Sequence, residues 1–256
     1  TPIKSSAASD VYKRQVYSFT DSPNIGDIHS FSFHNYVTLF TTPELIDMII
    51  GSIALAIGSA VLATILGTTG AIGAFYSKKN VNGTMSVLNQ IPVVNADVVT
   101  GFSLCILLVV VFGISKNTYI PLIIGHTVLS APFVYLAVVP KLKQMDPSLY
   151  EAALDLGATP GYTLIHIIIP QIASGIISGF VMAVTLSLDD YFVATYTKPA
   201  TFDTISTYVV NATKGSQTNI KTALWALSTI IFLIVVIVEV VMNFAPIKNE
   251  AQKEKH

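Results

Sequence analysis

The chain has 256 residues, of which 52% are hydrophobic and 11% are charged, and its formal net charge is −1. Soluble domains carry about a quarter charged residues, so this composition excludes an ordinary cytosolic globule and a disordered chain. The charge balance gives no basic footprint for nucleic acid, and the single cysteine, Cys105, excludes a disulfide framework and a cysteine-based zinc site. The long apolar runs do not alternate like barrel strands, which predicts an all-α integral membrane protein.

The N-terminal region contains no apolar run long enough to cross a membrane. Residues 1–15 are polar and are interpreted as a non-native leader or an artefact of sequence assembly. Residues 16–48 carry the turn markers Pro23, Gly26 and Pro43, which predict an extracytoplasmic segment.

Further along the chain, several segments reach the roughly 20 mainly apolar residues that a spanning helix needs. The predicted spans are residues 49–76, 87–114 (interrupted by Asp97), 116–141, 171–188 and 222–242. They define a transmembrane domain over 49–245 and a cytoplasmic tail over 246–256. Small residues recur every fourth position in the first span and, as Gly175, Gly179 and Ala183, in the fourth. Such lines favour close packing of helices in lipid.

Loop lysines indicate the orientation, because short cytoplasmic loops are enriched in Lys and Arg. One set of loops holds Lys78, Lys79, Lys141, Lys143, Lys248, Lys253 and Lys255, and the other holds Lys116, Lys198, Lys214 and Lys221. The first set is therefore assigned to the cytoplasm, together with the C-terminus and the loop over residues 141–170.

That loop has strong helix signals. Asp146 can cap a helix with Pro147 at its first position, and Gly157 can end it in a left-handed conformation, so we expect a helix over about 147–156. The side chains of Leu149, Ala152, Ala153 and Leu156 fall on one apolar face. A helix this short is marginal alone, so this face is expected to bury against a partner protein. A second short helix should begin at Thr159–Pro160, and Pro170 should end or kink it.

The same loop resembles a known motif. Glu151-Ala152-Ala153, Gly157 and Ile167-x-Ile169-Pro170 follow the E-A-A-x3-G-x9-I-x-L-P spacing found in permeases of bacterial ABC importers, with Ile169 in place of Leu. The resemblance implies a MetI-like helix bundle. It also implies that the loop helix, with Leu149, Glu151 and Leu156, is a coupling helix seated in a groove of an ATPase subunit.

The resemblance extends to PotC-type permeases of spermidine/putrescine importers over residues 17–242. It is carried by Asp97-Val98-Val99, by residues 186–190, by residues 205–209 and by residues 226–229. Such permeases have six spans, so the first span is expected to be missing here. The expected partners are a second, PotB-like permease, an ATPase dimer, a soluble polyamine-binding protein and membrane lipid. This chain has no G-x-x-x-x-G-K-[ST] motif, so it is expected to be non-catalytic and to bind no cofactor, with ATP used by the partner.

Carboxylates in or next to the spans are candidates for the substrate path, because charge in a bilayer is costly and faces the bundle interior or water. These are Asp97, Asp189 and Asp190, to which the resemblance adds Ser187. The alternatives are a solvated helix end for the aspartate pair and a capping or packing role for Asp97. His126 is expected to be packed or hydrogen-bonded rather than a metal ligand.

Two other functions remain open. One is an ABC permease for another small solute, such as thiamine, iron or a phosphonate. The other is a secondary transporter driven by an ion gradient, against which the loop motif argues. Dependence of uptake on ATP would distinguish the two classes.

Overall fold

A computed structural model describes residues 15–16, 18–20, 31–146, 148–214, 224–233 and 236. Two compact units are found: residues 51–206 form one, and residues up to 50 together with those from 207 form the other. The predicted leader apart from residue 15, the predicted tail and about half of the predicted last span lie outside the described residues. The part that is described is almost entirely helical, and its extended pairing is an isolated bridge between Thr20 and Phe31.

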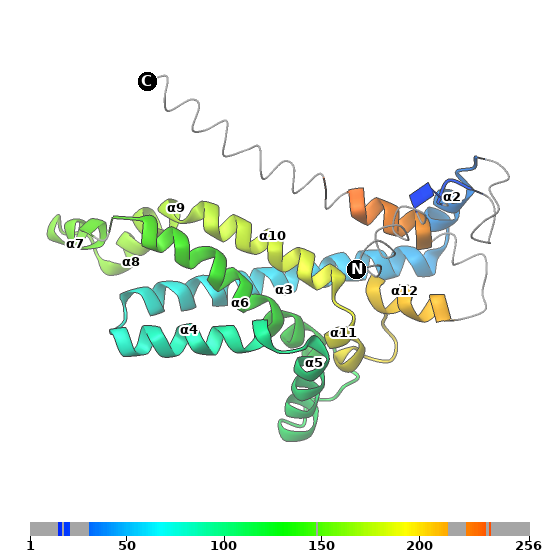
Figure 1. The fold of residues 1–256 in the computed structure, drawn as a ribbon, viewed down its shortest axis with the longest axis horizontal. Helices are drawn as coiled ribbons and strands as arrows, with labels where there is room; N and C mark the ends of the chain where they lie inside the picture. Colours follow the sequence, from blue (N-terminus) through cyan, green and yellow to red (C-terminus); the bar gives the residue numbers. More distant parts are fainter. Residues whose placement is uncertain are drawn as a thin grey trace, which may run out of the picture. The chain divides into compact units, whose positions relative to one another are not determined.

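The helices follow one another along the chain without a sheet between them in the described ranges (Figure 1). They are α2 (His34–Thr41), α3 (Pro43–Tyr76), α4 (Lys79–Val94), α5 (Asp97–Cys105), α6 (Ile120–Gln144), α7 (Ser148–Asp155), α8 (Pro160–Thr163), α9 (Ile169–Gln171), α10 (Ala173–Asp189), α11 (Phe192–Thr197) and α12 (Ile205–Lys214). Two π-helical turns, η1 (Ile106–Val111) and η2 (Leu164–Ile168), follow α5 and α8. Residues 224–233 are also helical.

The helices α3 and α6 are each long and apolar enough to cross a membrane. Two bent pairs pass the same test: residues 83–94 with 97–111, bent by 104°, and residues 160–171 with 173–189, bent by 72°. The part of the chain that is described thus holds up to four spans. The predicted spans over 49–76 and 116–141 are confirmed as α3 and α6, the predicted span over 171–188 falls on α10 of the second bent pair, and the helix over 224–233 lies within the predicted fifth.

The predicted span over 87–114 is interrupted near Asp97, as expected, and the chain bends there between α4 and α5. Asn95 and Ala96 have extended backbones, and the Nδ2 atom of Asn95 donates to the Oγ1 atom of Thr100 at 3.1 Å. Asp97 then occupies the first turn of α5, where a negative charge suits the helix dipole. Local polar chemistry therefore starts a new helix inside an otherwise apolar segment.

Within residues 51–206, the helices pack closely through small residues. A Cβ atom on Gly179 would lie 3.1 Å from the Cα atom of Val134, and one on Gly175 would lie 2.9 Å from the carbonyl oxygen of Ala137. Likewise, a Cβ atom on Gly67 of α3 would lie 2.7 Å from the carbonyl oxygen of Ala131. The small-residue lines thus serve packing inside the bundle, as the sequence predicts.

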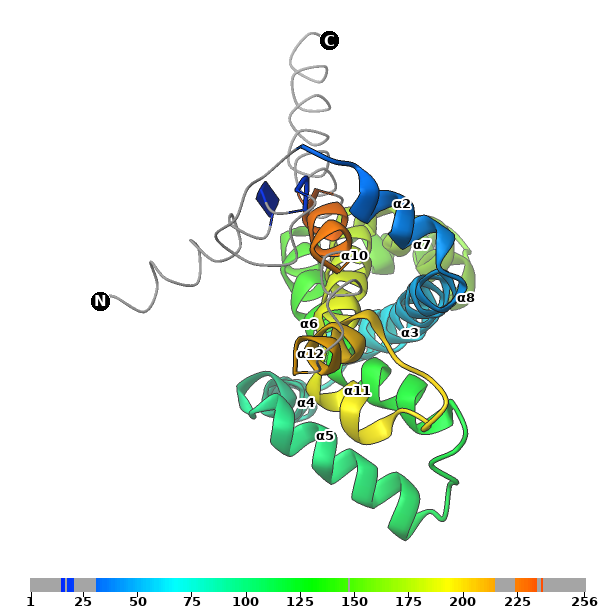
Figure 2. The same ribbon diagram turned by 90° about the vertical axis from the view of Figure 1, so that its right-hand side faces the viewer.

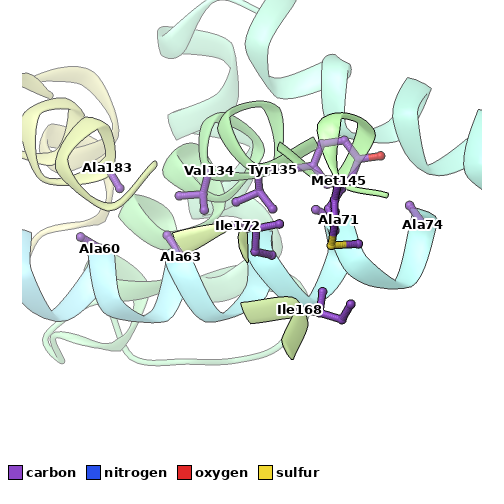
Figure 3. Packing of buried hydrophobic residues seen from close by; sticks show 12 residues of the cluster. Ala60, Ala63, Ala71, Ala74, Val134, Tyr135, Met145, Ile168, Ile172 and Ala183 are labelled. Carbon is purple, nitrogen blue, oxygen red and sulfur yellow. The ribbon is translucent and has the colours of Figure 1, made fainter. Parts of the chain in front are cut away.

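The core of this unit lies between α3, α6 and α10, with one side of α3 contributing a row of alanines (Figure 3). Its buried members are Ala60, Ala63, Ala71, Ala74, Val134, Tyr135, Val138, Leu142, Met145, Ile168, Ile172 and Ala183. Short alanine side chains let the larger side chains of α6 and η2 sit against the α3 backbone.

The two ends of the 51–206 unit differ in the helices that they gather. At one end, the ring of Tyr76, at the end of α3, lies 4.9 Å from that of Tyr150 on α7. At the other end, α5 packs on α11, where a Cβ atom on Gly101 would lie 2.9 Å from the Cα atom of Val193 (Figure 2). The α7 end also holds Lys78 and the lysine-bearing C-terminus of α6, which agrees with its predicted cytoplasmic placement.

Candidate functional site

The helix α7 begins and ends where the sequence predicts. The Oδ1 atom of Asp146 accepts hydrogen bonds from the backbone N–H of Ser148 at 2.9 Å and from its hydroxyl at 2.7 Å. These bonds lower the pKa of the Asp146 carboxyl and favour its charged form at the N-terminus of α7. At the other end, Gly157 has a φ of +86°. The N–H of Ala158 donates to the carbonyl of Ala153 at 3.0 Å, as in a Schellman cap.

In the structure, some residues of the predicted apolar face of α7 are packed inside the chain and others are exposed. Leu149 and Tyr150 pack against the core, and Ala153 is buried. In contrast, Ala152 is exposed, and Leu156 has 90% of its surface accessible. The expectation that this face buries against a partner protein therefore does not apply to Leu149 and Ala153, which pack within the chain, whereas Ala152 and Leu156 are left exposed for such a contact. Leu156 lies in the capping turn that follows α7, where its N–H still donates to the carbonyl of Ala152 at 3.2 Å.

The outward side of the loop consequently has both charge and apolar surface. Its exposed residues on or next to α7 are Glu151, Ala152, Asp155 and Leu156, which we call the α7 outer face. These side chains face away from the chain's own core and are available to a partner. They include the first two residues of the E-A-A motif, whereas Ala153 is used internally.

The second loop helix is also confirmed. The Oγ1 atom of Thr159 accepts from the N–H of Tyr162 at 3.4 Å, and Pro160 occupies the first turn of α8. The bend toward α10 falls at Ile172, two residues after Pro170. Along this segment the rings of Tyr162 and His166 stack with centroids 4.2 Å apart, and both side chains are exposed.

At the opposite end of the unit, Asp190 is a buried helix cap. Its Oδ1 atom accepts from the N–H of Val193 at 3.2 Å, and its Oδ2 atom accepts from the N–H of Ala194 at 2.7 Å. These donors belong to the first turn of α11, which otherwise leaves its N–H groups unpaired. The alternative of a solvated helix end therefore does not hold for Asp190, whereas Asp189 is exposed.

The three candidate carboxylates lie at this same end. Asp97 is exposed in the first turn of α5, the helix that packs on α11. Both Asp97 and Asp189 interact electrostatically with Asp190. The structure therefore places Asp97 at the same end of the unit as Asp189 and Asp190, with Asp97 and Asp189 exposed and Asp190 buried.

Ser187, the fourth predicted path residue, lies inside the bundle. Its Oγ atom is 2.8 Å from the Nδ1 atom of His126 and 3.3 Å from the Oγ atom of Ser59. The prediction that His126 is packed and hydrogen-bonded is confirmed, and no cluster of metal-ligating side chains is found in the described ranges. The contacts that join His126 and Ser59 to Ser187 were not predicted from the sequence. An ionisable side chain in the middle of an apolar span was the available signal.

An apolar cavity of about 440 Å³ borders Ser59. It is lined by Gly51, Ala54, Leu55, Gly58, Ser59, Leu62, Tyr119, Leu122, Ile123 and Phe202. None of the predicted path carboxylates lines it, so its chemistry does not suit a multiply charged cation.

The chain is similar in sequence to membrane components of bacterial transport systems. Residues 67–245 match the family described as the binding-protein-dependent transport system inner membrane component. Over 211 residues, the chain is 30% identical to the spermidine/putrescine transport system permease protein PotC of Haemophilus influenzae, covering 81% of this chain and 80% of that protein. Over 187 residues, it is 31% identical to the putrescine transport system permease protein PotI of Escherichia coli K12. This match covers 71% of this chain and 66% of that protein.

The fold is similar to that of a bacterial ABC transporter involved in the import of the acidic polysaccharide alginate. The TM-score is 0.68 at 18% identity, and the match covers 93% of this chain and 88% of the other. At this identity the likeness concerns the fold alone.

Proposed function

The chain belongs to the family of inner-membrane components of binding-protein-dependent transport systems, and on that premise we propose that it is the permease subunit of an ATP-driven polyamine importer. Its place is the inner membrane, which it crosses several times. The observation that carries the substrate class is the similarity to permeases named for spermidine and putrescine over most of the chain.

The α7 outer face supports coupling to a separate ATPase. A short capped helix whose inner side is attached to the core moves together with α3, α6 and η2. Its exposed residues, Glu151, Ala152 and Leu156, then enter a groove of the ATPase subunit as a helix-in-groove contact. Closure of an ATPase dimer would pull on α7 and, through the Tyr76–Tyr150 contact, on the end of α3. This chain is non-catalytic in that arrangement and binds no cofactor, and ATP is hydrolysed by the partner.

The acidic end supports a cationic substrate. Polyamines carry several positive charges, and the exposed carboxylates of Asp97 and Asp189 attract them across the aqueous path. Aromatic rings belong to the same segments. The ring centroid of Tyr196 lies 5.7 Å from that of Phe102 of α5, and Tyr191 follows Asp190 in the chain. Ring faces add cation–π attraction to an ammonium group. A soluble polyamine-binding protein delivers the substrate at this end, and a second, PotB-like permease completes the path.

The test is reconstitution of this chain with a PotB-like permease, the ATPase dimer and the binding protein in proteoliposomes. Radiolabelled spermidine and putrescine should accumulate only with ATP and should be unaffected by collapse of ion gradients. Accumulation that follows the ion gradient without ATP would instead identify a secondary transporter. If ATP drives uptake of thiamine, iron or a phosphonate but of neither polyamine, the permease role stands and the substrate class is wrong.

A further inference from the structure

A polar cluster made of Ser59, His126, Ser187 and Asp190 lies inside the apolar bundle. Its members come from α3, α6, α10 and the residue that follows α10, and each is buried. The His126 Nδ1 atom lies 2.8 Å from the Ser187 Oγ atom, which is 3.3 Å from the Ser59 Oγ atom. Burying polar groups among apolar helices costs free energy unless they are hydrogen-bonded, so these contacts hold the helices in one arrangement.

The other ring nitrogen of His126 faces the cap of α11. The His126 Nε2 atom lies 3.6 Å from the Asp190 Oδ2 atom and has no hydrogen-bond partner in the described part of the chain. That same oxygen accepts from the N–H of Ala194 at 2.7 Å. The imidazole of α6, a helix that itself packs on α11 beside Val193, therefore lies against the carboxylate and limits where the carboxylate can go.

The position of the Asp190 carboxylate affects the positions of the exposed carboxylates of Asp97 and Asp189. Asp190 holds the first turn of α11, and α11 packs on α5 with almost no space between Val193 and Gly101. Asp97 lies one turn before Gly101 on α5, and Asp189 is the chain neighbour of Asp190. A shift of the Asp190 carboxylate would therefore change the spacing of the acidic groups at this end.

We infer that His126 is a positioning residue, which holds the Asp190 carboxylate and thereby sets the arrangement of Asp97 and Asp189 for a cationic substrate. The inference rests on the proposed function for the identity of that substrate. It assigns no substrate contact to His126 itself, because the imidazole is fully buried.

Side-chain length distinguishes the two contacts of His126. His126→Gln can place an amide near the position of Nε2 and keep the contact to Asp190. His126→Asn reaches only the position of Nδ1 and keeps the contact to Ser187, whereas His126→Leu keeps neither. Ser130→Ala is the matched control, because Ser130 lies one turn further along α6, is equally buried, and its hydroxyl has no hydrogen-bond partner among the described residues.

The first measurement is spermidine uptake by the reconstituted complex, separated into apparent KM and maximal rate. We expect His126→Leu and His126→Asn to raise KM about tenfold with a smaller effect on the maximal rate. His126→Gln and Ser130→Ala should stay within about threefold of wild type. In combination with Asp190→Asn, His126→Leu should add little further, because residues that act through one another are not additive. Full additivity, or a Gln variant no better than Asn, would overturn the inference.

A second measurement does not depend on the substrate. In a Cys105→Ala background, the thiol introduced by Asp97→Cys is labelled with a cationic and an anionic methanethiosulfonate, and the ratio of the two rates reports the local acidic field. His126→Leu and His126→Asn should change this ratio by at least about threefold, and His126→Gln should restore it. An unchanged ratio in folded, membrane-inserted Leu and Asn variants would contradict the positioning role. Failure of wild-type polyamine uptake with the expected ratios would count against the substrate alone.

Discussion

Two aspartates in this protein each cap a short helix, but one of them is exposed and the other is buried. Asp146 and Asp190 each follow a long helix and cap a short one. Asp146 is exposed and its carboxylate accepts from Ser148, two residues away, whereas Asp190 is buried and faces His126 from a distant helix. The first cap fixes the start of α7, and the second ties α11 into the bundle. The same capping hydrogen bonds therefore have different consequences, depending on whether the carboxylate is exposed or packed against a side chain of another helix.

The largest effect is expected from removing the buried cap. Asp190→Ala leaves the N–H groups of Val193 and Ala194 without an acceptor inside the protein, and unpaired buried groups are costly. Uptake should fall by at least about tenfold, with weaker protection of α11 amides in hydrogen exchange. The paired variant, Asp146→Ala, should leave α11 protection unchanged. Equal protection of α11 in Asp190→Ala and wild type would show that this cap has no special role.

A comparably strong effect is expected at the end of α7. Gly157→Val forces a β-branched residue into a left-handed conformation, which costs about 1–2 kcal/mol. The loop should turn wrongly, and both ATP-dependent uptake and co-purification of the ATPase should fall roughly tenfold. Gly161→Val is the control, because Gly161 has no positive φ and has open space where a Cβ would sit. Similar losses in both variants would point to general damage of the loop.

Smaller effects are expected from the exposed charges at the two ends. Glu151→Lys on the α7 outer face should weaken ATPase binding by about two- to fivefold, because the charge of a docking surface is reversed. Asp97→Asn and Asp189→Asn should raise the KM for polyamine by a similar factor while ATPase pull-down stays normal. The two classes are separated by measuring pull-down and uptake on the same preparations. Glu151→Lys with unaltered pull-down would exclude the α7 outer face as the docking surface.

The smallest effect concerns the pH dependence of the exposed cap. The Ser148 bonds lower the pKa of Asp146 in the folded chain, so its stabilising contribution is present above the unfolded pKa. That contribution is lost as the pH falls through the lowered folded value, below about 4. The protection of α7 amides, taken relative to their intrinsic exchange rate at each pH, should fall slightly there, and Asp146→Asn should remove this fall. A steeper acid response in Asp146→Asn than in wild type would contradict the sign.

How much could be read from the sequence differs along the chain. The ends of α7 were predictable because capping residues act on neighbours within a turn. The burial of its face was not, since Tyr150 rather than Ala152 turned inward against Tyr76 and the core. The interruption at Asp97 was predicted, but the sharp bend was not, because an apolar run shows its length but not the local hydrogen bond of Asn95 that restarts the helix.

By itself, the sequence determined the membrane environment, the main spans, the small-residue packing lines and the capped loop with its E-A-A motif. Each of these depends on composition or on residues within a few positions of one another. Only the tertiary structure decided that Ser59, His126, Ser187 and Asp190 form one buried cluster, and that Asp97 joins Asp189 at the same end. Those contacts join residues far apart in the chain, and no periodicity encodes them. They arise from how closely α5, α6, α10 and α11 pack through their glycines.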